Sequence, residues 1–257
     1  MTAALMAMLA SFGAGVVDAV VGGGGLILVP AMFTLFPAAP PPTLFGTNKC
    51  AMVWGTASAA WHFIRRVDLR WPVLLPACAC ALIAAAAGAW EATRVDPRLA
   101  RLALPLVLLA LLAYTLWRRE LGLQHSPHGT MARQAALASA IGTTVGFYDG
   151  FFGPGTGSVL VLLFVRWLGY DFVRASAAAK CINTATNLAA LGWFAASGHV
   201  WWRLGAAMAV CNVAGSLLGS GLAIRLGVQF VRRVFILVVS VLVLKTGWDA
   251  CHLLSLV

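Results

Sequence analysis

The sequence GVVDAVVGGGGL at residues 15–26 returns as GFYDGFFGPGTG at residues 146–157, an offset of 131 residues. In both copies an aspartate stands four residues before a glycine cluster, inside an otherwise apolar segment. Clustered glycines weaken a helix because they leave the backbone unrestricted. We therefore expect an apolar helix that breaks at the glycines, and we expect this break twice in the chain.

The same offset aligns the two halves of the chain without a gap. Only three lysines are present, and two of them, Lys49 and Lys180, coincide. Other matches are Phe33 with Phe164, Cys50 with Cys181, Phe63 with Phe194, Trp71 with Trp202, Gly88 with Gly219, and Arg94 with Arg225. Self-similarity at a fixed offset indicates an internal repeat. We expect two tandem homologous repeats, at residues 1–117 and 134–257, joined by a polar linker at residues 118–133.

The composition indicates an all-α integral membrane protein. Hydrophobic residues make up 61% of the 257 residues and charged residues only 10%, whereas a soluble domain has about 25% charged residues. Apolar runs of roughly 18 residues or more recur, and each is long enough to cross a hydrocarbon core of about 30 Å as a helix. We therefore expect a multi-pass protein whose main partner is the lipid bilayer.

Each half contains five apolar segments. They cover residues 3–21, 26–36, 46–64, 71–90 and 99–117 in the first half, and 134–152, 158–167, 175–196, 204–224 and 230–248 in the second. The second segment of each half has only about ten residues, too few to span a bilayer. Short, Gly-interrupted segments at matching places in two halves are typical of a transporter's midplane binding site. We expect about four to five segments per repeat, about eight to ten spans in all, with Gly-interrupted half-helices.

Basic residues are unevenly divided among the predicted loops. If each repeat crosses the membrane an odd number of times, one side carries eleven basic residues and the other four; with an even number, the split is seven against eight. Because cytoplasmic loops are enriched in Lys and Arg, we expect inverted repeats, a cytoplasmic linker and both termini on the opposite side. The net charge of +10 is spread over short loops, so we expect no nucleic-acid partner.

Asp18 and Asp149 precede the glycine clusters inside apolar helices. A carboxylate within a membrane is costly and is by default a candidate functional group. Two interpretations stay open at this point. Each aspartate either takes part in proton coupling, or caps backbone N–H groups that the helix break frees.

The glycine clusters and the helices that follow them form the predicted substrate site. Glycines at a helix break expose N–H groups that attract anions at the start of the next half-helix. Lys49 and Lys180 begin the next helices, where they either neutralise an anionic substrate across the repeat axis or extend to the membrane interface. The predicted substrate-binding residues are Lys49, Lys180, Asn48, Thr47, Asn183, Asn187, Gly23, Gly24, Gly155 and Thr156. Met52 replaces Asn183 at the equivalent position, so the half-sites differ chemically.

The remaining reactive side chains form no enzyme motif. The five histidines and six cysteines do not combine at metal-ligand spacing, and the cysteines are interpreted as small packing residues. The sequence has no Ser/His/Asp arrangement, no phosphate-binding loop preceded by a strand and no HExxH zinc motif. We expect no catalytic residue, metal or cofactor, and no enzymatic activity.

These motifs resemble those of the TauE/SafE sulfite exporter family. The resemblance rests on residues 15–26, on GTNK at residues 46–49 and, most specifically, on residues 146–157, and it covers nearly the whole chain. It implies a prokaryotic-type inner-membrane transporter built from two repeats. Members of this family are associated with sulfite, sulfonates and other organosulfur anions. Membership of a family limits function to a class, and the site decides the rest.

The expected function is secondary transport of a small organosulfur, sulfite-type or carboxylate anion across the inner membrane. We expect proton coupling and alternating access between the inverted repeats. The alternatives are a passive anion channel and a membrane subunit or assembly factor without its own transport. The sequence leaves open the substrate, the direction of transport, the coupling ion and the oligomeric state.

Overall fold

The computed structural model describes residues 2–96, 98–99, 106, 129–222 and 240, and all regular structure in these ranges is α-helical. The labelled helices are α1 (Thr2–Val21), α2 (Gly24–Leu35), α3 (Pro41–Ile64), α4 (Trp71–Ala92), α6 (Met131–Phe151), α7 (Thr156–Leu168) and α8 (Phe172–Ala196). A further helix covers Trp202–Leu222. The prediction of an all-helical protein is confirmed. The predicted segments at 99–117 and 230–248, and most of the linker at 118–133, lie outside the described residues.

Helix lengths follow the predicted pattern. By length and apolar composition, Thr2–Val20, Trp71–Ala92 and Trp202–Leu222 can cross a membrane. The short apolar helices α2 and α7 have 12 and 13 residues and follow the two glycine clusters. The predicted half-helices at residues 26–36 and 158–167 are therefore present, and each begins two residues earlier than expected.

The helices α3 and α8 also begin earlier than the apolar pattern predicts, and each has a local signal at its first turn. α3 begins at Pro41 with Pro42 beside it, and a proline at the first helical position loses no intrahelical hydrogen bond. α8 begins after Asp171, whose carboxylate accepts hydrogen bonds from the N–H groups of Val173 at 3.0 Å and Arg174 at 2.9 Å. Such a cap satisfies N–H groups that have no intrahelical partner.

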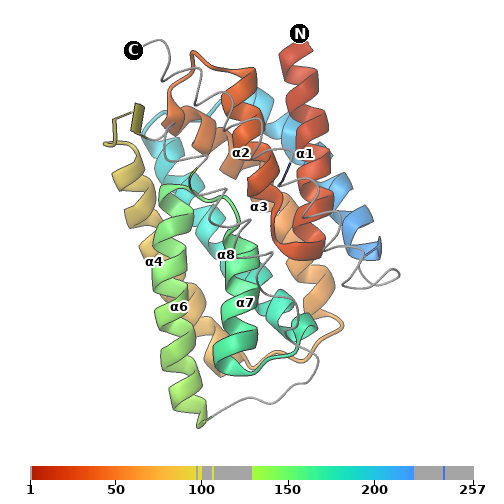
Figure 1. The fold of residues 1–257 in the computed structure, drawn as a ribbon, viewed down its shortest axis with the longest axis vertical. Coiled ribbons are helices and arrows are strands. Elements are labelled where there is room, and N and C mark those ends of the chain that lie inside the picture. The colour runs from red at the N-terminus through yellow and green to blue at the C-terminus, as the bar shows by residue number, and fades with distance from the viewer. Residues whose placement is uncertain (1, 97, 100–105, 107–128, 223–239, 241–257) are drawn as a thin grey trace.

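The glycine clusters break the chain into two helical hairpins, α1 with α2 and α6 with α7. Gly22 follows α1 with a φ of 77°, and Gly153 follows α6 with a φ of 93°, values that glycine adopts readily. In Figure 1, α1 runs inward from the N-terminal end of the bundle and α6 enters from the opposite end. The hairpin tips meet inside the bundle, where the Ser158 N–H donates to the Gly22 carbonyl at 3.1 Å.

Small residues let the longer helices approach closely. A Cβ on Gly146 of α6 would lie 2.6 Å from the Ala81 carbonyl oxygen of α4, and a Cβ on Gly15 of α1 would lie 2.2 Å from the Asn212 carbonyl oxygen. These two contacts join positions that correspond at an offset of 131 residues. A second set of contacts follows the same offset. A Cβ on Gly88 would lie 2.1 Å from the Phe147 carbonyl oxygen, and a Cβ on Gly219 would lie 2.3 Å from the Val16 carbonyl oxygen.

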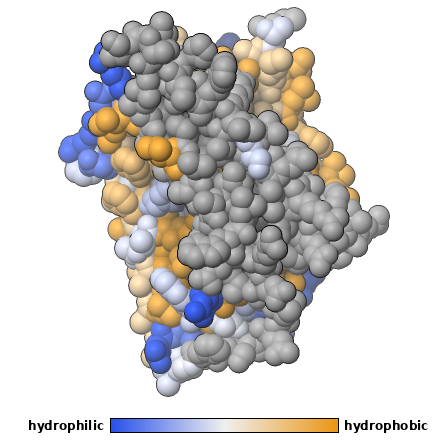
Figure 2. Space-filling view, viewed as in Figure 1, coloured by the Kyte–Doolittle hydropathy of each residue, from blue (hydrophilic) through white to orange (hydrophobic). Residues whose placement is uncertain are grey.

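The two ends of the bundle are identified by loop contacts. Phe36 packs on Trp201 with ring centroids 5.2 Å apart, which brings the α2–α3 and α8–Trp202 connections to one end. At the other end, Arg70 Nη1 donates to Gln134 Oε1 at 3.2 Å, next to the start of α6. Apolar side chains cover the visible outer faces of α1 and α4, and hydrophilic residues gather toward the ends (Figure 2). Such an apolar belt suits a lipid environment.

Candidate functional site

Two ion pairs cross between the halves of the molecule. Lys49 Nζ of α3 lies 2.8 Å from Asp149 Oδ2 of α6, and Lys180 Nζ of α8 lies 2.7 Å from Asp18 Oδ2 of α1. All four side chains are at most 3% exposed. Neither lysine extends to an end of the bundle. Buried charges are tolerated only when they are paired and hydrogen-bonded, so each aspartate depends on a lysine from the opposite half of the chain.

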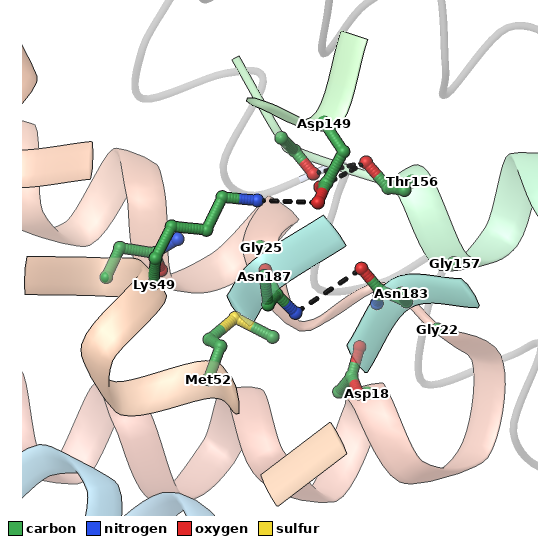
Figure 3. A pocket seen from close by; sticks show the side chains of 12 residues that line it. Asp18, Gly22, Gly25, Lys49, Met52, Asp149, Thr156, Gly157, Asn183 and Asn187 are labelled. Carbon is green, nitrogen blue, oxygen red and sulfur yellow. Dashed lines mark hydrogen bonds and ion pairs between the residues drawn. The ribbon is translucent and has the colours of Figure 1, made fainter. Parts of the chain in front are cut away.

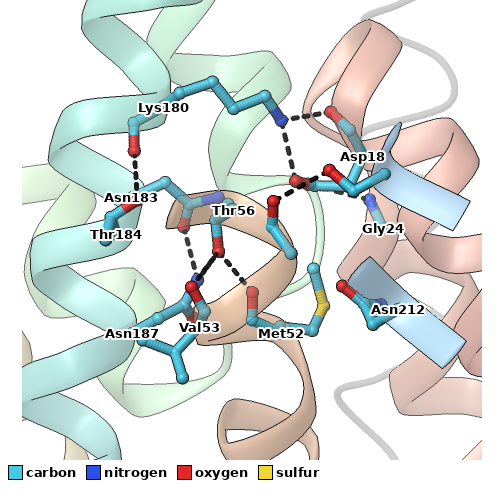
Figure 4. A network of polar contacts seen from close by, with 12 residues as sticks. Asp18, Gly24, Met52, Val53, Thr56, Lys180, Asn183, Thr184, Asn187 and Asn212 are labelled. Atoms are coloured by element: carbon cyan, nitrogen blue, oxygen red, sulfur yellow. Dashed lines mark hydrogen bonds and ion pairs between the residues drawn. The ribbon is translucent and has the colours of Figure 1, made fainter. Parts of the chain in front are cut away.

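The Asp18 pair sits at the first helix break. Lys180 donates to both the carboxylate and the main-chain carbonyl of Asp18. The Gly24 N–H, at the start of α2, donates to Asp18 Oδ1 at 3.3 Å. Asp18 therefore caps the start of α2 and also links the α1–α2 hairpin to α8 (Figure 4).

The Asp149 pair has a different environment. Its Oδ1 accepts a hydrogen bond from the Thr156 hydroxyl at 2.7 Å. Lys49 is the sole partner of Asp149 Oδ2 among the residues that the structure describes. The glycine that follows is close as well, since a Cβ on Gly153 would lie 3.1 Å from Lys49 Nζ. Among the described residues, no backbone N–H is recorded as donating to Asp149 in the way that the Gly24 N–H donates to Asp18.

A small buried cavity lies between these pairs and the hairpin tips (Figure 3). Its volume of about 10 Å³ is room for about one water molecule. Five of the predicted substrate-binding residues line it: Asn48, Lys49, Thr156, Asn183 and Asn187. The cavity is too small for a larger anion, which enters only if lining side chains or the hairpin tips move apart.

The other five predicted substrate-binding residues lie outside the cavity wall. Lys180 is directed to Asp18, and the Thr47 hydroxyl accepts the Trp201 N–H at 3.0 Å near one end of the bundle. Gly23 and Gly155 stand at the N-caps of α2 and α7. The Gly24 N–H donates to the Asp18 carboxylate, as described above. These residues position the site rather than line it.

Side-chain amides supply the neutral polar groups of the site. Asn187 Nδ2 donates to Asn183 Oδ1 at 3.4 Å and to Thr56 Oγ1 at 3.3 Å. Asn48 is 3% exposed, and its Oδ1 has no hydrogen-bond partner within the described part of the chain. A buried amide oxygen without a partner is uncommon, so Asn48 has bonding capacity to offer a ligand.

The predicted set of substrate-binding residues left out several residues of the cavity wall. The glycines at the hairpin tips, Gly22, Gly25, Gly153 and Gly157, line it together with Met52. Met52 follows Lys49 by three residues, a spacing that places two side chains on one helix face. Thr56 and Asn187 are 131 residues apart and in contact. This contact was detectable in principle, because equivalent residues of two halves meet at a pseudo-symmetry axis.

Among the described residues, no group of three or more His, Cys, Asp or Glu side chains is placed to hold a metal ion. The polar groups of the cavity are instead lysines, carboxylates, amides and a hydroxyl. Ammonium and amide groups donate hydrogen bonds to anions.

The sequence model of the sulfite exporter TauE/SafE family matches residues 7–246. The chain belongs to this family. It is therefore a membrane protein, as its apolar helices indicate. The matched range contains both glycine clusters and both ion pairs.

Three relatives match over most of their length. A probable membrane transporter protein of Haemophilus influenzae is 32% identical over 242 residues, 93% of this chain and 92% of the relative. A probable membrane transporter protein of Sinorhizobium is 34% identical over 245 residues, which are 95% of this chain and 92% of the relative. The probable membrane transporter protein YfcA of Escherichia coli K12 is 32% identical over 245 residues, which are 95% of this chain and 88% of the relative. No solved structure matches this TauE/SafE family member.

Proposed function

We propose that this protein is a multi-pass, inner-membrane secondary transporter of a small organosulfur, sulfite-type or carboxylate anion, coupled to proton movement. The observation that supports this most directly is the pair of crossed Lys–Asp contacts around a cavity between two broken helices. A lysine held on a carboxylate presents its ammonium to an anion when the carboxylate is neutralised or moves away. The names of the relatives, probable membrane transporter proteins, agree with this class of function.

We further propose that the chain is built from two inverted repeats, residues 1–117 and 134–257. The helix contacts that recur at an offset of 131 residues support the duplication. The entry of α1 and α6 from opposite ends of the bundle supports the inversion. Inverted repeats allow two similar conformations that open to opposite sides of the membrane.

The small cavity suggests how access alternates. It holds about one water molecule, so substrate entry requires the hairpin tips to separate on one side while they stay in contact on the other. The tips meet through glycine backbone, at Gly22 with Gly157 and at Gly25 with Gly153. Contacts without side chains slide and separate at little steric cost, which suits a gate.

Transport is tested with purified protein in liposomes, using sulfite, a sulfonate and a simple carboxylate as probes. Accumulation of one probe against its gradient, driven by a pH gradient, is the expected result. Lys49→Gln is expected to weaken binding of that probe about 10–100-fold, because a hydrogen bond to a charged group is worth about 1.5–3 kcal/mol. Equilibration without accumulation would instead indicate a channel, and absence of flux for every probe would contradict the proposed transport.

The proposed topology places the connection at residues 65–70 in the cytoplasm and the connection at residues 197–201 outside. By the bounds of the helices that they flank, the arginines of the described part of the chain divide into six at the first end and three at the other: Arg65, Arg66, Arg70, Arg133, Arg166 and Arg174 against Arg94, Arg98 and Arg203. Cytoplasmic loops are enriched in such residues. In a cysteine-free background, Ser197→Cys is therefore expected to react with an impermeant maleimide added to intact cells, and Asp68→Cys only after lysis. The reverse labelling pattern would refute the orientation.

A further inference from the structure

Helices of the two sequence halves are exchanged between two groups in space. α4 belongs to the first half, but it packs on α6 and α8 of the second half rather than on α1, α2 or α3 (Figure 1). The helix Trp202–Leu222 belongs to the second half, but its Asn212 and Gly219 pack on α1. Ser216 of the same helix donates to the Gly55 carbonyl of α3 at 2.8 Å. One helix of each half therefore packs with the helices of the other half.

This exchange produces two helical bundles. The first bundle consists of α1, α2, α3 and the helix Trp202–Leu222, and the second consists of α4, α6, α7 and α8. One cluster of buried apolar side chains comes from the helices of the second bundle and the α7–α8 connection. The other cluster comes mainly from the first bundle, with Phe152 and Phe194 as the largest side chains that join it from the second. Because buried apolar contacts define a core, each bundle has a core of its own.

Inside each bundle, the exchanged helix packs closely on its neighbours. In the first bundle, Asn212 Nδ2 donates to the Ser11 carbonyl at 2.9 Å, and Ser11 Oγ donates to the Met208 carbonyl at 2.8 Å. In the second bundle, a Cβ on Gly142 or on Gly146 of α6 would lie 2.6 Å from a carbonyl oxygen of α4. Membrane helices associate through such close backbone contacts and interhelical hydrogen bonds. We therefore expect each bundle to move as one body.

The contacts between the two bundles are of another kind. Both buried ion pairs cross this boundary, Lys49 with Asp149 and Lys180 with Asp18. The hairpin tips meet there through glycine backbone, and the small cavity lies beside them. Charged side chains that separate can bond to water or to an anion instead, whereas apolar cores that separate lose their contacts outright. The boundary between the bundles is therefore the surface that opens most readily.

α3 and α8 lie along this boundary and pack on each other. Thr56 and Asn187, which correspond at the 131-residue offset, are in contact there, with Asn187 Nδ2 3.3 Å from Thr56 Oγ1. The connections at residues 65–70 and 197–201 both lead from one bundle to the other, at opposite ends of the molecule. A rocking movement about α3 and α8 keeps both connections intact while one side of the boundary opens.

We propose that alternating access is a rocking movement of the first bundle against the second along α3 and α8, with the substrate passing between the bundles. Each moving body then contains helices of both repeats, and neither repeat moves as a unit. This inference rests on the proposed transport function and identifies the parts of the molecule that move. The ion pairs and the cavity lie at the boundary that opens, where separation of a lysine from its aspartate presents an ammonium group to an anion.

Distances between spin labels in the cysteine-free protein test the proposal. Leu5 and Ala206 belong to one bundle but to different repeats, whereas Leu5 and Ala87 belong to one repeat but to different bundles. The equivalent pairs at the 131-residue offset are Ala136 with Leu75 and Ala136 with Leu218. All of these side chains are exposed, so a label on any of them displaces no core residue. The four pairs therefore distinguish moving bundles from moving repeats.

Double electron–electron resonance is recorded in liposomes with chloride alone and with sulfite, methanesulfonate or acetate. It is also recorded for a variant without the two ion pairs, which combines Asp18→Asn, Lys49→Met, Asp149→Asn and Lys180→Met. The wild-type comparison decides the matter if this variant does not fold.

The two between-bundle distances, Leu5–Ala87 and Ala136–Leu218, should shift or split into two populations with one of the anions and broaden in the variant. The two within-bundle distances, Leu5–Ala206 and Ala136–Leu75, should stay the same. The opposite pattern would mean that the repeats move as units and would overturn the inference. Four unchanged distances under every condition would overturn it as well.

Uptake measurements then separate this inference from the proposed function. A bismaleimide whose length matches the measured distance links the two cysteines of each pair. Uptake of the anion in liposomes should survive the Leu5–Ala206 link and be lost with the Leu5–Ala87 link. The reverse outcome contradicts the inference and leaves transport intact. A wild type that takes up none of the three anions contradicts the proposed function, and the distances in the variant without ion pairs still decide which helices move together.

Discussion

Replacing Lys180 with methionine is expected to lower the free energy of unfolding by about 3–5 kcal/mol, the usual cost of removing one partner of a buried ion pair. The ammonium of Lys180 is 2.7 Å from Asp18 Oδ2, and both side chains are 3% exposed. Without Lys180, the carboxylate would lose its paired cation and keep the neutral Gly24 N–H at 3.3 Å. Unfolding in mixed detergent micelles measures the loss.

The control for this prediction is the double variant Asp18→Asn with Lys180→Met. Removing both charges takes away the uncompensated carboxylate, and the Asn oxygen still accepts the Gly24 N–H, so most of the lost stability should return. Lys49→Met offers a second comparison, because it removes the buried cation paired with Asp149 at 2.8 Å, and it should cost a similar amount. Equal losses in the single and double Lys180 variants would contradict a specific pair.

The architecture was predictable where the sequence repeats itself. The offset of 131 residues and the glycine clusters indicated two broken helices, and the structure has α2 and α7 where short half-helices were expected. Helix starts were less predictable, because hydropathy does not register Pro41 or the Asp171 cap. A capping side chain acts on a few N–H groups and leaves the apolar pattern unchanged.

The candidate site was predictable in its residue types but not in its pairing. The sequence singled out two intramembrane carboxylates, Asp18 and Asp149, and two candidate anion-binding cations, Lys49 and Lys180. It could not assign each lysine to the aspartate of the other half. That assignment depends on how α3 and α8 cross the two hairpins. Thr47 is a second example of a contact that the sequence could not assign. It lies two residues before Lys49 in the sequence, but its hydroxyl accepts the Trp201 N–H instead of facing the cavity. Consecutive helix residues point in different directions.

Replacing Gly22 with alanine is expected to reduce transport strongly and to destabilise the protein by about 1–3 kcal/mol more than the same change at Gly198. The two glycines have nearly identical backbones, with φ of 77° and 76°. Alanine in this left-handed region costs about 1–2 kcal/mol at either position. Only at Gly22 would the new Cβ meet backbone, 2.6 Å from the Gly157 carbonyl carbon, whereas at Gly198 nothing lies within 4 Å.

The difference between the two variants therefore isolates the contact between the hairpin tips. Gly157→Ala provides an independent check from the other tip, because its Cβ would lie 2.5 Å from the Gly22 carbonyl oxygen and its backbone is helical. Its control is Gly192→Ala, an exposed helical position with nothing within 4 Å, where alanine favours the helix. Uptake in liposomes and unfolding in micelles are measured for all four. If Gly22→Ala matches Gly198→Ala in both, the tips do not need to touch for transport, and the gate lies elsewhere.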